Sequence, residues 1–148
     1  MEQEDLINAK VLVTGASGFI GSALSKKLLK LGAIVYGVSR RNIKTDDGIK
    51  WYKGDLSDLD FVTALIKEIK PDYIYHMASH VCGARNYENM ELTFKSNLVT
   101  TFNLLLTIHN IACKRIILAG SFEEVNSNSD ISIPSSPYAA AKFAALNY

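Results

Sequence analysis

The sequence predicts an α/β fold with a doubly wound parallel sheet. Apolar runs of strand length alternate with helical periodicity, glycines stand at the turns between them, and 148 residues suffice for one compact domain. With 48% hydrophobic and 21% charged residues, the composition argues against a disordered chain or a disulfide scaffold. We therefore expect a single domain over residues 1–148, with right-handed crossovers between its strands.

The first third of the chain reads as strand, helix and strand. Ala9–Thr14 is a short apolar run rich in β-branched residues, which predicts a strand buried on both faces. Over Phe19–Leu31 apolar residues recur every three or four positions until Gly32 stops the pattern, which predicts a helix. Ile34–Ser39 then returns to the strand pattern.

The middle of the chain repeats this alternation. Ile49–Lys53 predicts a short third strand. Apolar residues at positions 59, 62, 66 and 69 predict a helix that Ser57 or Asp58 caps and that ends before the proline at position 71. Tyr73–Met77 predicts the fourth strand.

Two helices and one strand complete the pattern. Arg115–Ala119 predicts a fifth strand, Asn126–Pro137 reads as a loop rich in Ser and Asn, and a last helix is expected from Tyr138. A long helix over Glu91–His109 is expected to bury one apolar side. That side consists of Phe94, Leu98, Phe102, Leu105 and Ile108.

Charge and cysteine content exclude several classes of protein. Sixteen Lys and Arg against fifteen Asp and Glu leave a net charge of +1, so nothing points to nucleic acid as a partner. Cys82 and Cys113 match no zinc or redox spacing, so we expect reduced thiols and no metal site. The acidic start lacks the features of a secretory signal, and no apolar run reaches the roughly 18–20 residues of a membrane span. We therefore expect a cytoplasmic protein without membrane contact.

A glycine-rich turn joins the first strand to the first helix. Its glycines allow a tight turn, close approach of a pyrophosphate and packing of the helix on its strand, and the helix N-terminus adds amides and partial positive charge. A structural turn is the alternative, but the position between strand and helix predicts a Rossmann-type, NAD(P)-binding domain. The residues expected to contact the dinucleotide are Gly15, Ser17, Gly18, Phe19, Ile20 and Gly21.

Two arginines follow the second strand. Sites that prefer NAD usually carry Asp or Glu there, whereas this chain has Arg40 and Arg41. Their guanidinium groups can pair with the 2′-phosphate of NADP, although two solvated loop arginines are the alternative. The sequence therefore favours NADP as cofactor, with NAD as the second candidate.

Together these motifs resemble the extended short-chain dehydrogenase/reductases, which include NAD(P)-dependent nucleotide-sugar epimerases, dehydratases and reductases. The resemblance implies that Asp55 and Leu56 hold the adenine ring and that Ala78 lies against the cofactor; taken alone, Asp55 equally suits a helix cap. The matching segments, in family order, are residues 14–21 (TGASGFIG), residues 54–56 (GDL), residues 71–78 (PDYIYHMA), Asn97, and residues 136–138 (SPY) with Lys142.

The resemblance also implies a catalytic pair, Tyr138 and Lys142. Four residues apart on a helix, both side chains lie on the same face; without the family frame, such a pair would be read as a surface pair. A neighbouring ammonium and a cationic nicotinamide favour the tyrosine phenolate, whose ordinary pKa is near 10. Tyr138 would then exchange a proton with a sugar hydroxyl or ketone during hydride transfer, and Lys142 would also hold the nicotinamide ribose.

A third catalytic group is expected after the fifth strand, where the family carries a Ser or Thr. Aligning the segment on Val125 places Phe122 at that position and Ser121 one residue earlier, so Ser121 is the candidate hydroxyl although one residue of slip changes the face. Glu123 and Glu124 stand where dehydratases of the family carry an acidic pair, which makes Glu124 a candidate base. Similar acidic segments also occur in 4-keto-sugar reductases.

The resemblance implies an NAD(P)-dependent oxidoreductase acting on a nucleotide-activated sugar, of the 4-keto-sugar reductase or epimerase type. A nucleotide-sugar 4,6-dehydratase and a non-catalytic NAD(P)-binding module are the alternatives. Family members are usually about twice as long, so we expect the substrate domain to be absent from this sequence and the piece alone to be inactive. The family also implies a homodimer, formed through the helix over Glu91–His109 and the helix from Tyr138 onward.

Overall fold

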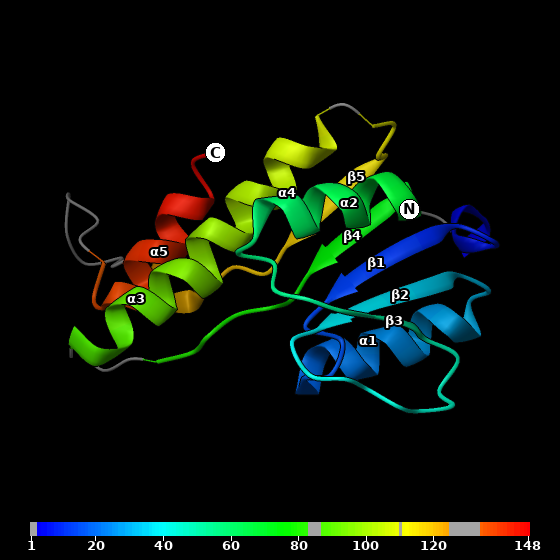
Figure 1. Ribbon diagram of the computed structural model, residues 1–148, viewed down its shortest axis with the longest axis horizontal. Helices are drawn as coiled ribbons and strands as arrows, with labels where there is room; N and C mark the ends of the chain where they lie inside the picture. Colours follow the sequence, from blue (N-terminus) through cyan, green and yellow to red (C-terminus); the bar gives the residue numbers. More distant parts are fainter. Residues whose placement is uncertain (1–2, 83–86, 110, 125–133) are drawn as a thin grey trace.

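The computed structural model describes residues 3–82, 87–109, 111–124 and 134–148. Five parallel strands form one sheet in the order β3-β2-β1-β4-β5 (Figure 1). The central strand β1 (Lys10–Thr14) pairs with β2 (Ile34–Ser39) and β4 (Tyr73–His76), and the edges are β3 (Lys50–Lys53) and β5 (Arg115–Leu118). This confirms the predicted Rossmann-type α/β fold, with every strand bound within one residue of its prediction.

Helices cover both faces of the sheet. The apolar side chains of β1 point alternately to opposite faces, so each face needs a helix layer to bury them. Val11 and Val13 belong to the core that the sheet forms with α1 (Phe19–Lys30), whereas Leu12 belongs to the core beneath α2 (Leu59–Ile69) and α4 (Thr100–Ile108). All three side chains are fully buried, which stabilises the fold by about 1.5–3 kcal/mol for each of them. Figure 1 shows α1 and α2 on opposite sides of the sheet.

Helix α2 shows why the chain turns where it does. Of the two predicted caps, Asp58 is the one used: its side chain accepts hydrogen bonds from the amides of Asp60 and Phe61. Such a cap contributes about 1 kcal/mol. The helix ends at Lys70, which adopts the left-handed conformation with φ of 49° directly before Pro71.

The predicted single helix over Glu91–His109 is interrupted. The structure has α3 (Met90–Thr93), a π-helical segment labelled η3 (Phe94–Val99), and α4. A π turn takes an extra residue, so it rotates the residues that follow relative to a regular helix. The predicted apolar side is therefore buried only in part: the side chains of Phe94 and Phe102 are 53% and 42% exposed, whereas Ile108 packs against the core. The residues buried instead are mostly polar, namely Thr93, Asn97, Thr100, Thr101, Asn103 and Leu104.

The last helix, α5 (Pro137–Ala145), begins one residue before Tyr138 and is capped by the side chain of Ser136. The predicted loop over Asn126–Pro137 lies largely outside the described residues, which omit 125–133. Three short turns complete the described chain: η1 (Gln3–Leu6), η2 (Tyr87–Asn89) and η4 (Phe122–Glu124). In the described ranges, no helix is both long enough and apolar enough to cross a membrane.

Candidate functional site

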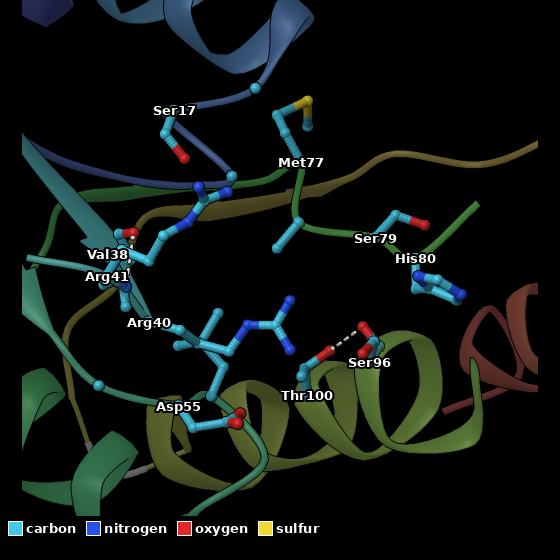
Figure 2. A pocket seen from close by; sticks show the side chains of 16 residues that line it. Ser17, Val38, Arg40, Arg41, Asp55, Met77, Ser79, His80, Ser96 and Thr100 are labelled. Carbon is cyan, nitrogen blue, oxygen red and sulfur yellow. Dashed lines mark hydrogen bonds between the residues drawn. The ribbon is translucent and has the colours of Figure 1, made fainter. Parts of the chain in front are cut away.

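A cavity of about 290 Å³ opens where β1, β2 and β4 end (Figure 2). In the sheet, β2 and β3 lie on one side of β1, and β4 and β5 lie on the other, so the strand order reverses between β1 and β4. Ligands of open parallel sheets bind at such a switch point. The cavity brings together most of the residues predicted to contact a dinucleotide. These are Gly15, Ser17, Gly18, Arg40, Arg41, Asp55, Leu56 and Ala78.

The turn after β1 is built for close backbone contact. Gly15 has φ of 67°, and a Cβ there would lie 2.8 Å from the amide nitrogen of Ala78. A Cβ on Gly21 would overlap the carbonyl oxygen of Gly15. Gly18 caps α1 without a side-chain hydrogen bond, so no capping side chain covers the first amides of this helix. The turn and the helix dipole together suit a phosphate group.

Three predicted contact residues of the turn lie outside the cavity lining. The side chains of Phe19 and Ile20, in the first turn of α1, are 94% and 66% exposed. Gly21 is buried behind the turn, where it packs on Gly15. Among the described residues, these three do not line the cavity.

Asp55 serves its own turn as well as lining the cavity. One oxygen, Oδ1, accepts hydrogen bonds of 2.9 Å from both the amide and the hydroxyl of Ser57. The hydrogen bond from the backbone amide of Ser57 lowers the pKa of the Asp55 carboxyl. Burial opposes this shift, whereas the hydrogen bond from the Ser57 hydroxyl and the charges of Arg40 and Lys95 lower the pKa further. Both readings of Asp55 therefore have support: it fixes the entry to α2, and it presents a carboxylate to the cavity.

The two arginines that follow β2 both enter the cavity (Figure 2). The guanidinium group of Arg41 reaches toward Ser17, and that of Arg40 reaches across the cavity between Asp55 and Thr100. Ser39 supports this bend, since its hydroxyl accepts a hydrogen bond of 3.1 Å from the amide of Arg41. Two guanidinium groups therefore lie within the cavity, and either can pair with an anionic group.

Asn97 fixes the segment that follows β4. Its side chain is fully buried, and its Oδ1 accepts hydrogen bonds of 2.8 Å from the hydroxyl of Ser79 and the amide of His80. Its Nδ2 donates to the carbonyl of His80 at 2.9 Å. Asn97 lies inside the π-helical segment, so the interrupted helix places this amide beside the cavity wall.

Tyr138 and Lys142 are buried on the same side of α5, with exposed fractions of 6% and 5%. The ammonium of Lys142 donates a hydrogen bond of 2.7 Å to the carbonyl of Ala119, just after β5. Their spacing of four residues on α5 agrees with a common face of the helix. Among the described residues, neither of them lines the cavity, which ends at Ser79, His80 and Ser96 on the side toward α5.

The segment after β5 separates the candidate hydroxyl from its neighbour. Ser121 is half-buried and its Oγ accepts a hydrogen bond from the amide of Glu123, whereas Phe122 is 99% exposed. The carboxylate of Glu123 accepts a hydrogen bond of 3.2 Å from Ser136, the cap of α5. The backbone of Glu124 belongs to η4, but its side chain lies outside the described part of the structure, as does Val125.

Several cavity residues were missed by the sequence reasoning. Val38 and Ser39 end β2 and Ser79 follows β4, so the rule that ligands bind at the carboxyl ends of parallel strands was enough to find them. Ser96 and Thr100 come from the interrupted helix. Nothing in their spacing indicated that this polar side would turn toward the sheet.

Comparison with known proteins identifies relatives for nearly the whole chain. It is 30% identical over 156 residues to UDP-glucose 4-epimerase of Mycolicibacterium smegmatis, which covers 94% of this chain and 50% of that protein. It is 28% identical over 172 residues to GDP-mannose 4,6-dehydratase of Vibrio cholerae, with 96% and 46% covered. The chain thus spans about half the length of these curated relatives.

Solved structures share the fold. MoeE5 in complex with UDP-glucuronic acid and NAD is 29% identical, with a TM-score of 0.78 and coverage of 93% of this chain and 47% of that one. A UDP-glucose 4-epimerase from Thermotoga maritima superposes with a TM-score of 0.82 at 23% identity, covering 94% and 49%, and so supports the fold alone. The model of the NAD dependent epimerase/dehydratase family matches residues 11–148. The chain therefore belongs to the NAD dependent epimerase/dehydratase family.

Proposed function

We propose that this chain supplies the cofactor site and the Tyr138–Lys142 pair of an oxidoreductase that acts on a nucleotide-activated sugar, of the 4-keto-sugar reductase or epimerase type. The observation that carries the proposal is the cavity at the switch point of the sheet, with its glycine turn and its two arginines. Relatives named as nucleotide-sugar epimerases and dehydratases support the substrate class.

The residues of the cavity fit a dinucleotide. The glycine turn leaves room for a diphosphate where any Cβ would meet backbone, and Asp55 and Ala78 line the same space. A nicotinamide cofactor supplies a hydride acceptor and donor when bound. The chain's own part is to bind this group through the turn, Asp55 and Ala78, and to orient it toward α5.

Tyr138 is proposed to move the proton and Lys142 to assist it. Both side chains are buried on α5, and the ammonium of Lys142 is held by the carbonyl of Ala119 just after β5. In this proposal Tyr138 takes a proton from a sugar hydroxyl, or returns one to a ketone, while Lys142 also holds the ribose of the cofactor. Ser121, half-buried beside the fully exposed Phe122, is the hydroxyl proposed to contact the reacting oxygen.

The first test replaces Tyr138 with Phe in the full-length protein. Turnover of a nucleotide-4-keto-sugar should fall by at least about a hundredfold, the lower bound for loss of a general acid–base group, while the dinucleotide Kd stays within about threefold. Tyr52→Phe is the matched control, since its hydroxyl donates to Glu68 of α2, outside the residues that line the cavity, and the variant should retain full activity. Unchanged turnover in Tyr138→Phe would remove this residue from the mechanism.

We propose NADP as the preferred cofactor. Arg40 and Arg41 both reach into the cavity, and a charge-assisted hydrogen bond to a phosphate contributes about 1.5–3 kcal/mol, or roughly 10- to 100-fold in affinity. Titration with NADPH and NADH should show a preference of that size, which Arg41→Ala should reduce. Lys44→Ala, a change outside the residues lining the cavity, is the control and should leave the preference unaltered. Tighter binding of NADH would contradict the assignment of the arginines.

A 4,6-dehydratase is the second candidate function. The acidic pair Glu123–Glu124 in the sequence favours it, and the carboxylate of Glu123 contacts Ser136 at the start of α5. A dehydratase releases a product that is one water lighter than its nucleotide-sugar substrate, whereas an epimerase leaves the mass unchanged. Mass spectrometry of the product separates the two, and Glu124→Gln should abolish the loss of water. Dinucleotide binding without turnover of any nucleotide-sugar would instead indicate a non-catalytic binding module.

We propose that the protein forms a homodimer through α3, α4 and α5. Large apolar side chains on these helices are 37–54% exposed, and a second cavity of about 250 Å³ between them is lined by apolar residues. Phe94→Glu should shift the species measured by light scattering from dimer to monomer, while the exposed Ile7→Glu, at the far end of the sheet, should not. The exposed apolar side chains along this part of the chain are Met90, Leu92, Phe94, Phe102, Leu106, Phe143 and Leu146.

A further inference from the structure

His76 is a buried histidine that the proposed function does not use. It stands at the last position of β4, opposite Thr14 in the parallel register of β1, and is 2% exposed. Both ring nitrogens have partners: Nδ1 lies 2.7 Å from the hydroxyl of Thr14, and Nε2 lies 3.1 Å from the hydroxyl of Thr101 and 3.4 Å from that of Thr100. The imidazole thus connects two strands with the helix over them.

The hydrogen on the ring can be placed from its neighbours. The hydroxyl of Thr101 donates its one hydrogen to the carbonyl of Asn97 at 2.9 Å, and that of Thr100 donates to the carbonyl of Ser96 at 2.9 Å. Neither hydroxyl has a hydrogen left for His76, so Nε2 must be the donor in these contacts. His76 is therefore in the Nε2–H form.

The other ring nitrogen follows from this assignment. Nδ1 carries no hydrogen and accepts from the hydroxyl of Thr14. The same Thr14 oxygen accepts a hydrogen bond of 3.0 Å from the amide of Ala78. A single chain of hydrogen bonds thus runs from Thr101 through His76 and Thr14 to the amide of Ala78, with donor and acceptor fixed at each step.

This chain ends at the wall of the cavity. Ala78 and Gly15 both line it, and the two backbones approach so closely that a Cβ on Gly15 would lie 2.8 Å from the Ala78 nitrogen. While the hydrogen of the Thr14 hydroxyl points to His76, a lone pair of the same oxygen is directed at the Ala78 amide. His76 and the Ala78 amide are thus connected through a single hydroxyl, that of Thr14.

The main chain of His76 serves the other side of the site. Its carbonyl accepts a hydrogen bond of 3.1 Å from the amide of Ala119. The carbonyl of Ala119 in turn accepts a hydrogen bond of 2.7 Å from the ammonium of Lys142. The same residue is thus connected to both the cofactor cavity and the Lys142 side chain on α5.

We propose that His76 is a positioning residue of the dinucleotide site: its Nε2–H imidazole orients the Thr14 hydroxyl, which holds the Ala78 amide against the glycine turn. This inference rests on the proposed cofactor function of the cavity. The residue acts through Thr14 and Ala78 and makes no contact with the ligand itself. Loss of the Thr14 bond should consequently weaken dinucleotide binding, whereas loss of the Thr101 bond should affect mainly stability.

Two substitutions separate the two bonds. In His76→Asn the amide oxygen replaces Nδ1 and keeps the bond to Thr14, and in His76→Gln the amide nitrogen replaces Nε2 and keeps the bond to Thr101. Both variants should lose stability to urea, since each leaves a buried group unpaired. The dinucleotide Kd should rise about fivefold or more in His76→Gln, the equivalent of one net hydrogen bond, and stay within about twofold in His76→Asn.

Equal Kd changes in the two variants would overturn the proposal. If His76→Gln does not fold, Thr14→Val and Thr14→Ser replace it: the valine variant should weaken binding by the same factor, and the serine variant, which keeps the hydroxyl, should restore it. ¹⁵N NMR of the wild-type ring should show a hydrogen on Nε2 alone, and a hydrogen on Nδ1 would also overturn the proposal. Because the NMR result needs no ligand, failure of the wild type to bind any dinucleotide would refute the cofactor function separately.

Discussion

Replacing Gly21 with alanine sets two physical effects against each other. Gly21 lies in the first turn of α1, where alanine favours the helix by about 1 kcal/mol over glycine. Its Cβ, however, would overlap the carbonyl oxygen of Gly15 and lie 2.7 Å from the carbonyl carbon, where ordinary contact begins at 3.4 Å. The obstacle is main chain of the glycine turn, which cannot rotate aside as a side chain would. Overpacking costs typically about 1–3 kcal/mol, and because both close contacts are to main chain we take the upper part of that range, about 2–3 kcal/mol. The clash therefore outweighs the helix propensity.

We therefore expect Gly21→Ala to lower the free energy of unfolding by about 1–2 kcal/mol, and to raise the dinucleotide Kd at least tenfold because the helix start moves away from the turn. Urea denaturation and ligand titration measure the two quantities. Gly18→Ala is the control for stability, since its Cβ would stand 3.2 Å from the same oxygen and requires a shift of only tenths of an ångström. A Gly21→Ala protein that is as stable as wild type and binds equally well would refute the argument.

Three further predictions concern stability. Burial, assisted by the charge of Lys142, lowers the pKa of His76 to about 3, so its stabilising effect is complete above pH 6.5 and is lost as the pH falls toward 3. From pH 7.5 to 4.5 this group should cost the wild type roughly 3 kcal/mol of unfolding free energy, a loss that urea titrations should find missing in His76→Asn. Asp58→Ala should cost about 1 kcal/mol through loss of the α2 cap, and no change in the urea midpoint would contradict the capping assignment. Lys70→Gly should raise the thermal midpoint slightly, because glycine removes a left-handed strain of about 1 kcal/mol; a lower midpoint would show that the strain is absent.

The sheet was predictable because most of its strands are short apolar runs that lie between turn residues. This signal is local, so it can be recognised without knowing which strands pair. The interrupted helix was not, because its buried side is polar. Thr100 and Thr101 are buried on account of His76, and Asn97 on account of Ser79 and His80, all of them partners far away in the sequence. Periodicity counts apolar side chains, so it assigned the core side to residues such as Phe94 that the π turn leaves exposed.

The candidate site, too, could be predicted only in part. The glycine turn and the residues at the strand ends were predicted because parallel strands bring their carboxyl ends to one edge of the sheet. Phe19 and Ile20 belong to the same glycine-rich motif but lie in the first turn of α1. Successive side chains of a helix point in different directions, and those of Phe19 and Ile20 are exposed and do not line the cavity. Ser96 and Thr100 reach the cavity from a helix whose phase depends on the π turn.

The central position of β1 has a consequence for the order in which the domain assembles. One neighbour, β2, follows closely along the chain, but the other brings His76 beside Thr14 across 62 residues. While the nascent chain still lacks β4, one edge of β1 has no strand to pair with, and an unpaired edge invites association with other chains. Ala78, which lines the cavity, follows β4 and is therefore synthesised after β1 and β2. A coenzyme that needs Ala78 cannot stabilise the growing chain until more than half of these residues have left the ribosome.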